Sequence, residues 1–126
     1  MNKTALITGA SSGIGKKFAH IHAENGGDLV VVARSEDKLN ALKKELEDKH
    51  NITVTVIVKD LTAVDGPKEV YDSVKDKGIT VDFLINNAGF GGLGAFHERE
   101  IAKDLSMIQL NIIALVELSH HFFQDF

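Results

Sequence analysis

The feature that most constrains the fold of this chain is a glycine-rich segment at residues 8–15, which reads TGASSGIG. It follows a short apolar run at residues 3–8. It precedes a stretch in which Ile14, Phe18 and Ile21 recur at steps of four and three. That spacing is typical of an amphipathic helix, and we expect these three side chains to form its buried face. The sequence therefore predicts a strand that turns directly into a helix.

The residues of this turn predict what it binds. We expect Gly9 to permit a tight turn, Gly13 to let the backbone approach a phosphate, and Gly15 to let the helix pack closely on the strand. A helix N-terminus presents free N–H groups and the positive end of the helix dipole, so a pyrophosphate is the ligand that fits. A phosphate-loop NTPase is disfavoured, because Ala10 and Lys17 stand where that motif needs glycine and Ser or Thr.

The rest of the chain alternates strand-like and helix-like segments. Apolar runs of strand length occupy residues 28–33, 52–58 and 81–86, and a long apolar helix is expected from about residue 98 to 126. This order predicts one α/β domain over residues 1–126, with a parallel sheet of about four strands and helices on both faces. The last helix is apolar around most of its circumference, so we expect it to be buried on most sides.

Composition excludes several other classes of function. The chain of 126 residues has 14 basic and 18 acidic residues, a net charge of −4, and no basic run, so no nucleic-acid partner is expected. It has no cysteine, which excludes disulfides and thiol chemistry and fits a cytoplasmic location. No stretch approaches the ~18 apolar residues of a membrane-spanning helix, so no membrane partner is expected. The six histidines show no ligand pattern, and no metal site is predicted.

Four motifs together resemble the short-chain dehydrogenase/reductase family, in its N-terminal half. TGASSGIG is similar to the family's cofactor turn, and Asp60-Leu61-Thr62 to its adenine-site segment after the third strand. Asn86-Asn87-Ala88-Gly89 is similar to its motif after the fourth strand, and Asn111 to the Asn of its next helix. The resemblance covers nearly all of the chain. It implies a three-layer Rossmann-type half with strand order 3-2-1-4, and an oxidoreductase.

The resemblance also implies the residues that bind the cofactor. Asp60 and Leu61 would line the adenine pocket, and Asn86 would tie neighbouring strands together. Asn111 would be the catalytic residue present, in support of a water-linked proton path. The remaining expected cofactor contacts come from the glycine turn and from the loop after the fourth strand: Gly9, Ser11, Ser12, Gly13, Ile14 and Gly15, then Asn87, Ala88 and Gly89 beside the nicotinamide ribose.

The end of the second predicted strand selects the nucleotide. An NAD site usually has an acidic side chain there, about 20 residues past the glycines, which binds the ribose 2′-hydroxyl. This chain has Ala33 followed by Arg34. A guanidinium holds a 2′-phosphate through paired, charge-assisted hydrogen bonds, whereas a carboxylate repels it. We therefore predict NADP as the cofactor, with NADPH preferred over NADH.

The family's chemistry, as the resemblance implies, uses an Asn-Ser-Tyr-Lys set, of which Asn111 has a match here. The Ser, Tyr and Lys would follow residue 126, so we expect a truncated chain that lacks the C-terminal catalytic half. Tyr71 and Lys75 have the Tyr-x-x-x-Lys spacing, but any helix brings residues i and i+4 together. Because they precede Asn111, we interpret them as a helix surface.

Two functions remain open at this point. The chain would transfer hydride from NADPH, at most to a simple acceptor such as a quinone or dye, and carbonyl reduction by the chain alone is not expected. Alternatively, it is a non-catalytic nucleotide-binding hemi-fold or a fragment of an interrupted reductase gene.

The fourth strand and the last helix predict a partner. The strand sequence VDFLIN lacks the lysine, proline or bulge that usually protects a sheet edge. The final helix would expose an apolar patch large enough to bind another chain. We expect a symmetric homodimer through the last helix or the edge of the fourth strand.

Overall fold

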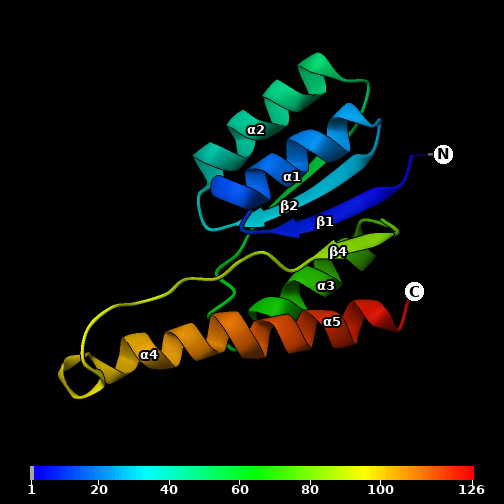
Figure 1. Cartoon of the computed structure of the whole chain (residues 1–126). Helices are drawn as coiled ribbons and strands as arrows, with labels where there is room; N and C mark the ends of the chain where they lie inside the picture. Colours follow the sequence, from blue (N-terminus) through cyan, green and yellow to red (C-terminus); the bar gives the residue numbers. More distant parts are fainter. Residues whose placement is uncertain (1) are drawn as a thin grey trace.

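Four parallel strands and the helices between them form the core of the molecule in a computed structural model that describes residues 2–126. The strands are β1 (Thr4–Thr8), β2 (Asp28–Ala33), β3 (Val54–Val58) and β4 (Phe83–Ile85), and they lie in the order β3-β2-β1-β4. The helices are α1 (Gly13–Glu24), α2 (Glu36–Lys49), α3 (Gly66–Asp76), α4 (Ile101–Ile108) and α5 (Leu115–Phe123) (Figure 1). The predicted strand order is confirmed.

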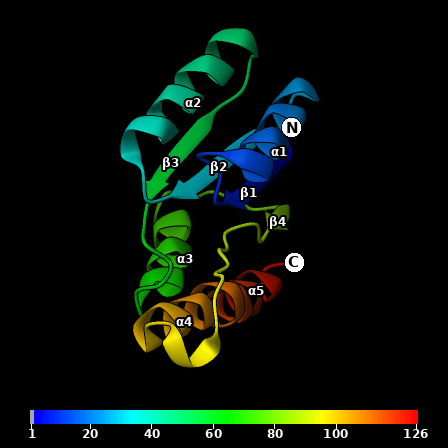
Figure 2. The same ribbon diagram turned by 60° about the vertical axis from the view of Figure 1, so that its left-hand side comes forward.

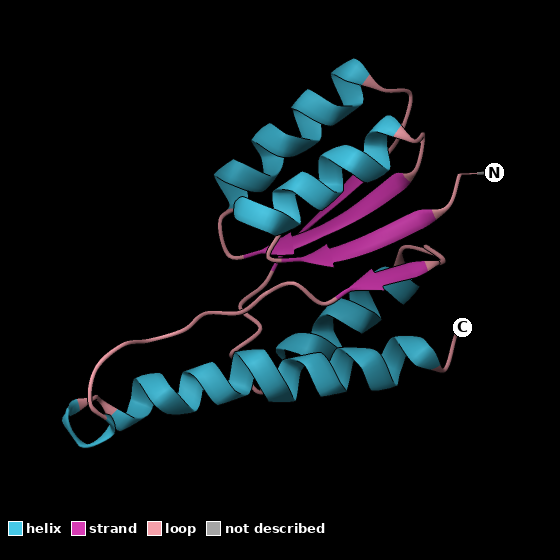
Figure 3. Ribbon diagram, in the orientation of Figure 1, coloured by secondary structure: helices cyan, strands magenta, loops and turns pink. Residues whose placement is uncertain are grey.

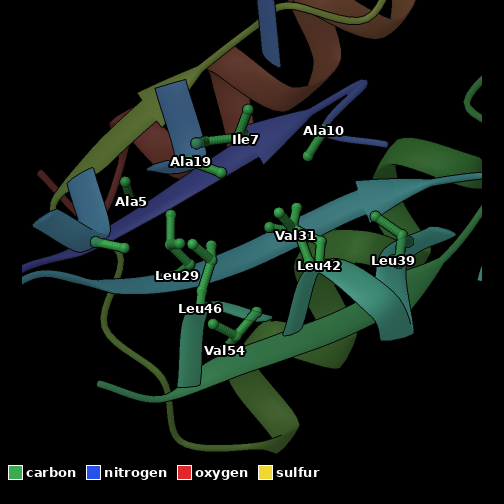
Figure 4. Close-up of a cluster of buried hydrophobic side chains, with 11 residues drawn as sticks. Ala5, Ile7, Ala10, Ala19, Leu29, Val31, Leu39, Leu42, Leu46 and Val54 are labelled. Atoms are coloured by element: carbon green, nitrogen blue, oxygen red, sulfur yellow. The ribbon is translucent and has the colours of Figure 1, made fainter. Parts of the chain in front are cut away.

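The sheet lies between two helical layers because successive strand residues point to opposite faces. Figure 2 shows α1 and α2 on one side of the sheet and α3 and α5 on the other. On the first side, one buried cluster includes Ile7, Val31, Ala19 of α1 and the leucines of α2, Leu39, Leu42 and Leu46 (Figure 4). On the second side lies a separate cluster from β1, β2, α3 and α5: Leu6, Val30, Val32, Val70, Val74, Leu118 and Phe122.

Helix α1 buries a different face from the predicted one. Ile14, Phe18 and Ile21 are exposed, and the expectation that they form the buried face is wrong. The buried residues of α1 are Gly15, Ala19 and Ala23. Their small side chains let the helix lie close to β1, and the large apolar side chains are left on the side of α1 that the sheet does not cover.

The last predicted helix is present but divided. A short 3₁₀ turn (Phe96–Glu98) precedes α4, and a π-helical segment (Gln109–Ala114) joins α4 to α5. The expected burial on most sides is wrong, because the buried residues of this stretch are Ala114, Leu118 and Phe122. Figure 3 shows the reason: α5 lies under the sheet, whereas α4 extends beyond it. Within residues 2–126, no helix has both the length and the apolar character needed to cross a membrane.

Candidate functional site

A cleft of about 490 Å³ lies at the carboxyl ends of the strands. Open α/β sheets bind ligands at this edge. The cleft joins residues that are far apart in the sequence, and ten of the predicted cofactor residues line it: Gly9, Ser11, Ser12, Ile14, Arg34, Asp60, Leu61, Asn87, Ala88 and Gly89. Gly13 and Gly15, also predicted, lie in the first turn of α1 and are not among the lining residues.

The glycine turn has the backbone geometry that its sequence predicted. Gly9 has a positive φ of 67°, and its N–H donates to the Val32 carbonyl at 2.8 Å. Gly13 has a φ of 57°, and a Cβ there would meet no neighbouring atom. At Gly15, by contrast, a Cβ would collide with the Gly9 carbonyl oxygen. Glycine is therefore favoured at residue 13 by the positive φ of the backbone, and at residue 15 by the close contact between α1 and the turn after β1.

Thr8 fixes the turn against the loop after β4. It is buried, and its Oγ1 accepts hydrogen bonds from the N–H groups of Asn87 at 3.0 Å and Ala88 at 2.9 Å. The Asn87 amide also donates to the Gly9 carbonyl at 3.3 Å. These bonds hold together the two loops that bound one end of the cleft. The sequence reasoning did not include Thr8 among the site residues. The available signal was its position at the end of β1.

Asp60 is the acidic residue among those that line the cleft. Its Oδ1 accepts hydrogen bonds from the Thr62 hydroxyl at 2.6 Å and from the Thr62 N–H at 2.9 Å. These two bonds, with a further contribution from the positive charge of Arg34, lower the pKa of Asp60 below its usual value. The group is therefore ionised at neutral pH and offers acceptors to a ligand.

The end of the cleft beside β2 is cationic. Arg34 follows β2 directly, and Lys38 lies in the first turn of α2. Lys59 lines the same cleft, although its ammonium pairs with Glu69. This end therefore suits a phosphate better than a ribose hydroxyl. Lys38 was not predicted, and the available signal was its place in the first turn of the helix that follows β2.

Asn111 does not line the cleft, but it holds a loop that does. Its Oδ1 accepts the N–H of Phe90 at 3.0 Å, and its Nδ2 donates to the Phe90 carbonyl at 2.8 Å. A Cβ on Gly89 would lie 2.7 Å from the same Oδ1. The Asn111 side chain is thus hydrogen-bonded to the backbone of the loop that carries Gly89. Its effect on the cleft is indirect, because it positions this loop.

The family model described as short chain dehydrogenase matches residues 3–126. The chain belongs to this family. The matched range includes the glycine turn, the segment after β3, the loop after β4 and Asn111.

Relatives of this short-chain dehydrogenase differ from it in length. A very-long-chain 3-oxoacyl-CoA reductase of Candida glabrata is 44% identical over 87 residues, which is 68% of this chain and 24% of that protein. The structure of L-sorbose reductase from Gluconobacter frateurii, complexed with NADPH and L-sorbose, has a TM-score of 0.92 at 32% identity, over 98% of this chain and 47% of that one. A short-chain dehydrogenase from Sphingobium yanoikuyae in complex with NADPH has a TM-score of 0.88 at 37% identity, over 95% of this chain and 47% of that one. The chain spans about a quarter to a half of the length of these relatives.

Tyr71 and Lys75 lie on α3 and are absent from the cleft lining of this short-chain dehydrogenase. Both bind Asp125, the Tyr71 hydroxyl at 3.0 Å and the Lys75 ammonium at 3.2 Å. The hydrogen bond to Asp125 raises the pKa of Tyr71, which is the wrong direction for a proton donor near neutral pH. The pair fastens α3 to the end of the chain.

Asn86 also has a structural partner, but not the predicted one. Its Nδ2 donates to the Ser119 hydroxyl at 3.0 Å. This hydrogen bond links the end of β4 to α5. We expected Asn86 to connect neighbouring strands, and it instead connects the sheet to a helix.

Proposed function

We propose that residues 1–126 form one dinucleotide-binding domain that binds NADP(H) in the cleft, with NADPH preferred over NADH. The observation that carries the proposal is the placement of Arg34 and Lys38 at the end of β2, in a cleft that begins at the N-terminus of α1. The solved structures of the Sphingobium and Gluconobacter relatives contain NADPH, which supports the same class of ligand here.

The residues present fit each part of this dinucleotide. The pyrophosphate would lie at the first turn of α1, whose leading N–H groups have no partner within the helix. Arg34 and Lys38 would hold the 2′-phosphate, and Asp60 and Leu61 would contact the adenine. The nicotinamide ribose would lie beside the loop from the end of β4, with the contacts predicted above: Asn87, Ala88 and Gly89.

The nucleotide preference has a direct test in titrations monitored by NADPH and NADH fluorescence. A charge-assisted bond to a phosphate contributes about 1.5–3 kcal/mol, so Arg34→Ala is expected to weaken NADPH binding about 10- to 100-fold. NADH has no 2′-phosphate, and its affinity is expected to stay within about twofold. Lys77→Ala is the matched control, because this exposed lysine follows α3 and does not line the cleft. Equal affinity of the wild type for both nucleotides would refute the preference.

The proposed reaction is limited by the side chains that reach the cleft. Bound NADPH supplies a hydride. Asn111 positions the loop that bounds the cleft. Tyr71, the one tyrosine in the sequence, lies on α3, and its hydroxyl binds Asp125. We therefore propose hydride transfer to a simple acceptor, such as a quinone or dye, that needs no protein proton donor. The alternative is a nucleotide-binding module without catalysis, and the proposed assembly in either case is a homodimer.

Turnover measurements separate the two functions. With NADPH in excess, quinone reduction above the rate of free NADPH is expected if the chain is an oxidoreductase, and simple carbonyls are expected to react at the background rate. The Tyr71→Phe variant is expected to retain the quinone rate, because its hydroxyl contacts Asp125 away from the cleft. Background rates with both acceptors, together with intact NADPH binding, would establish the non-catalytic module.

A further inference from the structure

The lining of the cleft changes in charge from one side of the sheet to the other. Its charged side chains belong to residues that follow β2 and β3: Arg34, Lys38, Lys59 and Asp60. In the sheet, β1 separates these two strands from β4. The lining residues between β4 and α5 have no charged side chain: Asn87, Ala88, Gly89, Phe90 and Leu110. A molecule that enters the cleft on the β4 side therefore meets uncharged groups.

The loop that begins in this uncharged lining is apolar along its length. Residues 90–96 read FGGLGAF and include no charged or hydrogen-bonding side chain. We call this segment the wall loop. Figure 3 shows that it runs beside α4, past the carboxyl ends of the strands. Because its first residue, Phe90, lines the cleft, the wall loop bounds the approach to the cleft on the β4 side.

Arg99 fastens the wall loop to α4 with all three nitrogens of its guanidinium. Its Nη1 donates to the Leu93 carbonyl at 2.7 Å, and its Nε and Nη2 both lie 2.7 Å from Oδ1 of Asp104. Asp104 belongs to the first turn of α4. The side chains of Arg99 and Asp104 are 17% and 14% exposed, so the loss of either partner leaves a largely buried charge without its counter-ion.

Gly92 leaves the space that this guanidinium occupies. A Cβ at residue 92 would overlap the Arg99 guanidinium, whereas a Cβ at Gly91 would meet no atom within 4 Å. Neither glycine has a positive φ, so an alanine at either position strains no backbone angle. Gly92→Ala is therefore expected to displace the Arg99 side chain, and Gly91→Ala is its matched control.

The wall loop has two separate attachments. Asn111 binds its first residue, Phe90, through the backbone N–H and carbonyl. Arg99 binds the carbonyl of Leu93, further along the loop. Phe90 lines the cleft, and Leu93 does not. Removal of the Arg99 side chain is therefore expected to free the outer part of the loop, while the part in the cleft lining stays attached.

From these contacts we propose that the wall loop binds the hydride acceptor, that the acceptor is an apolar ring compound without ionic groups, and that Arg99 is the positioning residue of this site. The phenylalanines of the loop, Phe90 and Phe96, favour contacts with rings. The charge of Arg99 is paired with Asp104, so it offers no counter-ion to an anionic acceptor. The inference rests on the NADP(H) binding proposed above. It adds the chemical class of the acceptor and the residue that holds its binding surface.

Calorimetric titration with menadione, an uncharged naphthoquinone, tests the site without turnover, because the complex with NADP⁺ has no hydride to transfer. The wild-type complex is expected to bind menadione at least about fivefold more tightly than a naphthoquinone sulfonate, whose charge finds no partner in the loop. Arg99→Ala and Gly92→Ala are expected to weaken menadione binding about 5- to 20-fold and to change NADP⁺ affinity less than about twofold. Gly91→Ala is expected to match the wild type. Unchanged menadione affinity in Arg99→Ala, equal weakening in the two glycine variants, or equal binding of the sulfonate would overturn the inference.

Hydrogen exchange shows whether the effect of Arg99 acts through the wall loop. The Glu98 N–H donates to the Ala95 carbonyl at 3.0 Å, and in Arg99→Ala it is expected to exchange about 10-fold faster, while the Phe90 N–H keeps its wild-type rate. Arg99→Lys retains a positive charge near Asp104 but has one nitrogen instead of three, so its menadione affinity is expected to lie between those of the wild type and Arg99→Ala. A wild type that binds NADP⁺ but not menadione contradicts this inference alone. A wild type that binds neither contradicts the nucleotide proposal as well.

Discussion

At the scale of single residues, Asn111 shows how a side chain can shape a site without entering it. Both polar atoms of its carboxamide are bonded to the backbone of Phe90, one as acceptor and one as donor. Phe90 lines the cleft, and Asn111 does not. In the structure, Asn111 is therefore a positioning residue for the loop between β4 and α4.

Removing the Asn111 side chain is expected to loosen that loop. In Asn111→Ala both hydrogen bonds are lost, each with a net contribution of about 0.5–1.5 kcal/mol. We expect the Phe90 amide to exchange with deuterium about 10-fold faster and NADPH affinity to fall about fivefold. Asn111→Asp keeps the acceptor for the Phe90 N–H, and its exchange rate is expected to lie between the two. Unchanged exchange at Phe90 in Asn111→Ala would show that the loop is held by other contacts.

Individual site residues could be predicted when one local pattern contained the whole reason for their role. The position of Arg34 in the cleft is an example, because its place at the end of an inner strand is visible in the sequence; its contact with a phosphate stays a prediction. Thr8 was missed, since its two hydrogen bonds depend on the pairing of β1 with β4, about 80 residues later. Lys38 depends in the same way on the start of α2 lying over the end of β2.

At the scale of elements, α1 shows the limit of periodicity as a signal. Two stripes of the same helix have helical spacing: Ile14, Phe18 and Ile21, and also Gly15, Ala19 and Ala23. The spacing located the helix correctly, but the larger side chains were chosen as the buried ones. Close packing on a strand requires small side chains, as the contact of Gly15 with Gly9 shows. The larger apolar side chains remain on the exposed face of α1.

The last helix shows a second limit. Its apolar residues indicated a helix over most of residues 98–126, and α4 and α5 confirm that part. The π-helical segment between them was not predictable from propensity, because each of its residues also fits an α-helix. A π turn adds one residue to the helical repeat and shifts the faces on either side of it. Asn111 lies in this segment, so the shift helps to set the direction in which its carboxamide points.

At the scale of the whole molecule, the cleft and the two hydrophobic clusters use the same strands. Residues that follow each of β1, β2, β3 and β4 line the cleft, while the residues within β1 and β2 pack on both helical layers. Loss of any one strand would therefore remove both a wall of the site and a part of the core.

This shared construction predicts a single thermal transition that NADPH shifts as a whole. A ligand present at about 100 times its dissociation constant stabilises the form that binds it by about 2.7 kcal/mol, which for a domain of this size raises Tm by about 10 °C. Circular dichroism at 222 nm, at one fixed protein concentration, measures the shift. Arg34→Ala is expected to unfold in the same single transition and to show a smaller shift at the same NADPH concentration, since Arg34 lies outside both clusters. If two thermal unfolding transitions were seen and NADPH raised the Tm of one of them alone, the cleft would belong to a part of the chain that folds by itself.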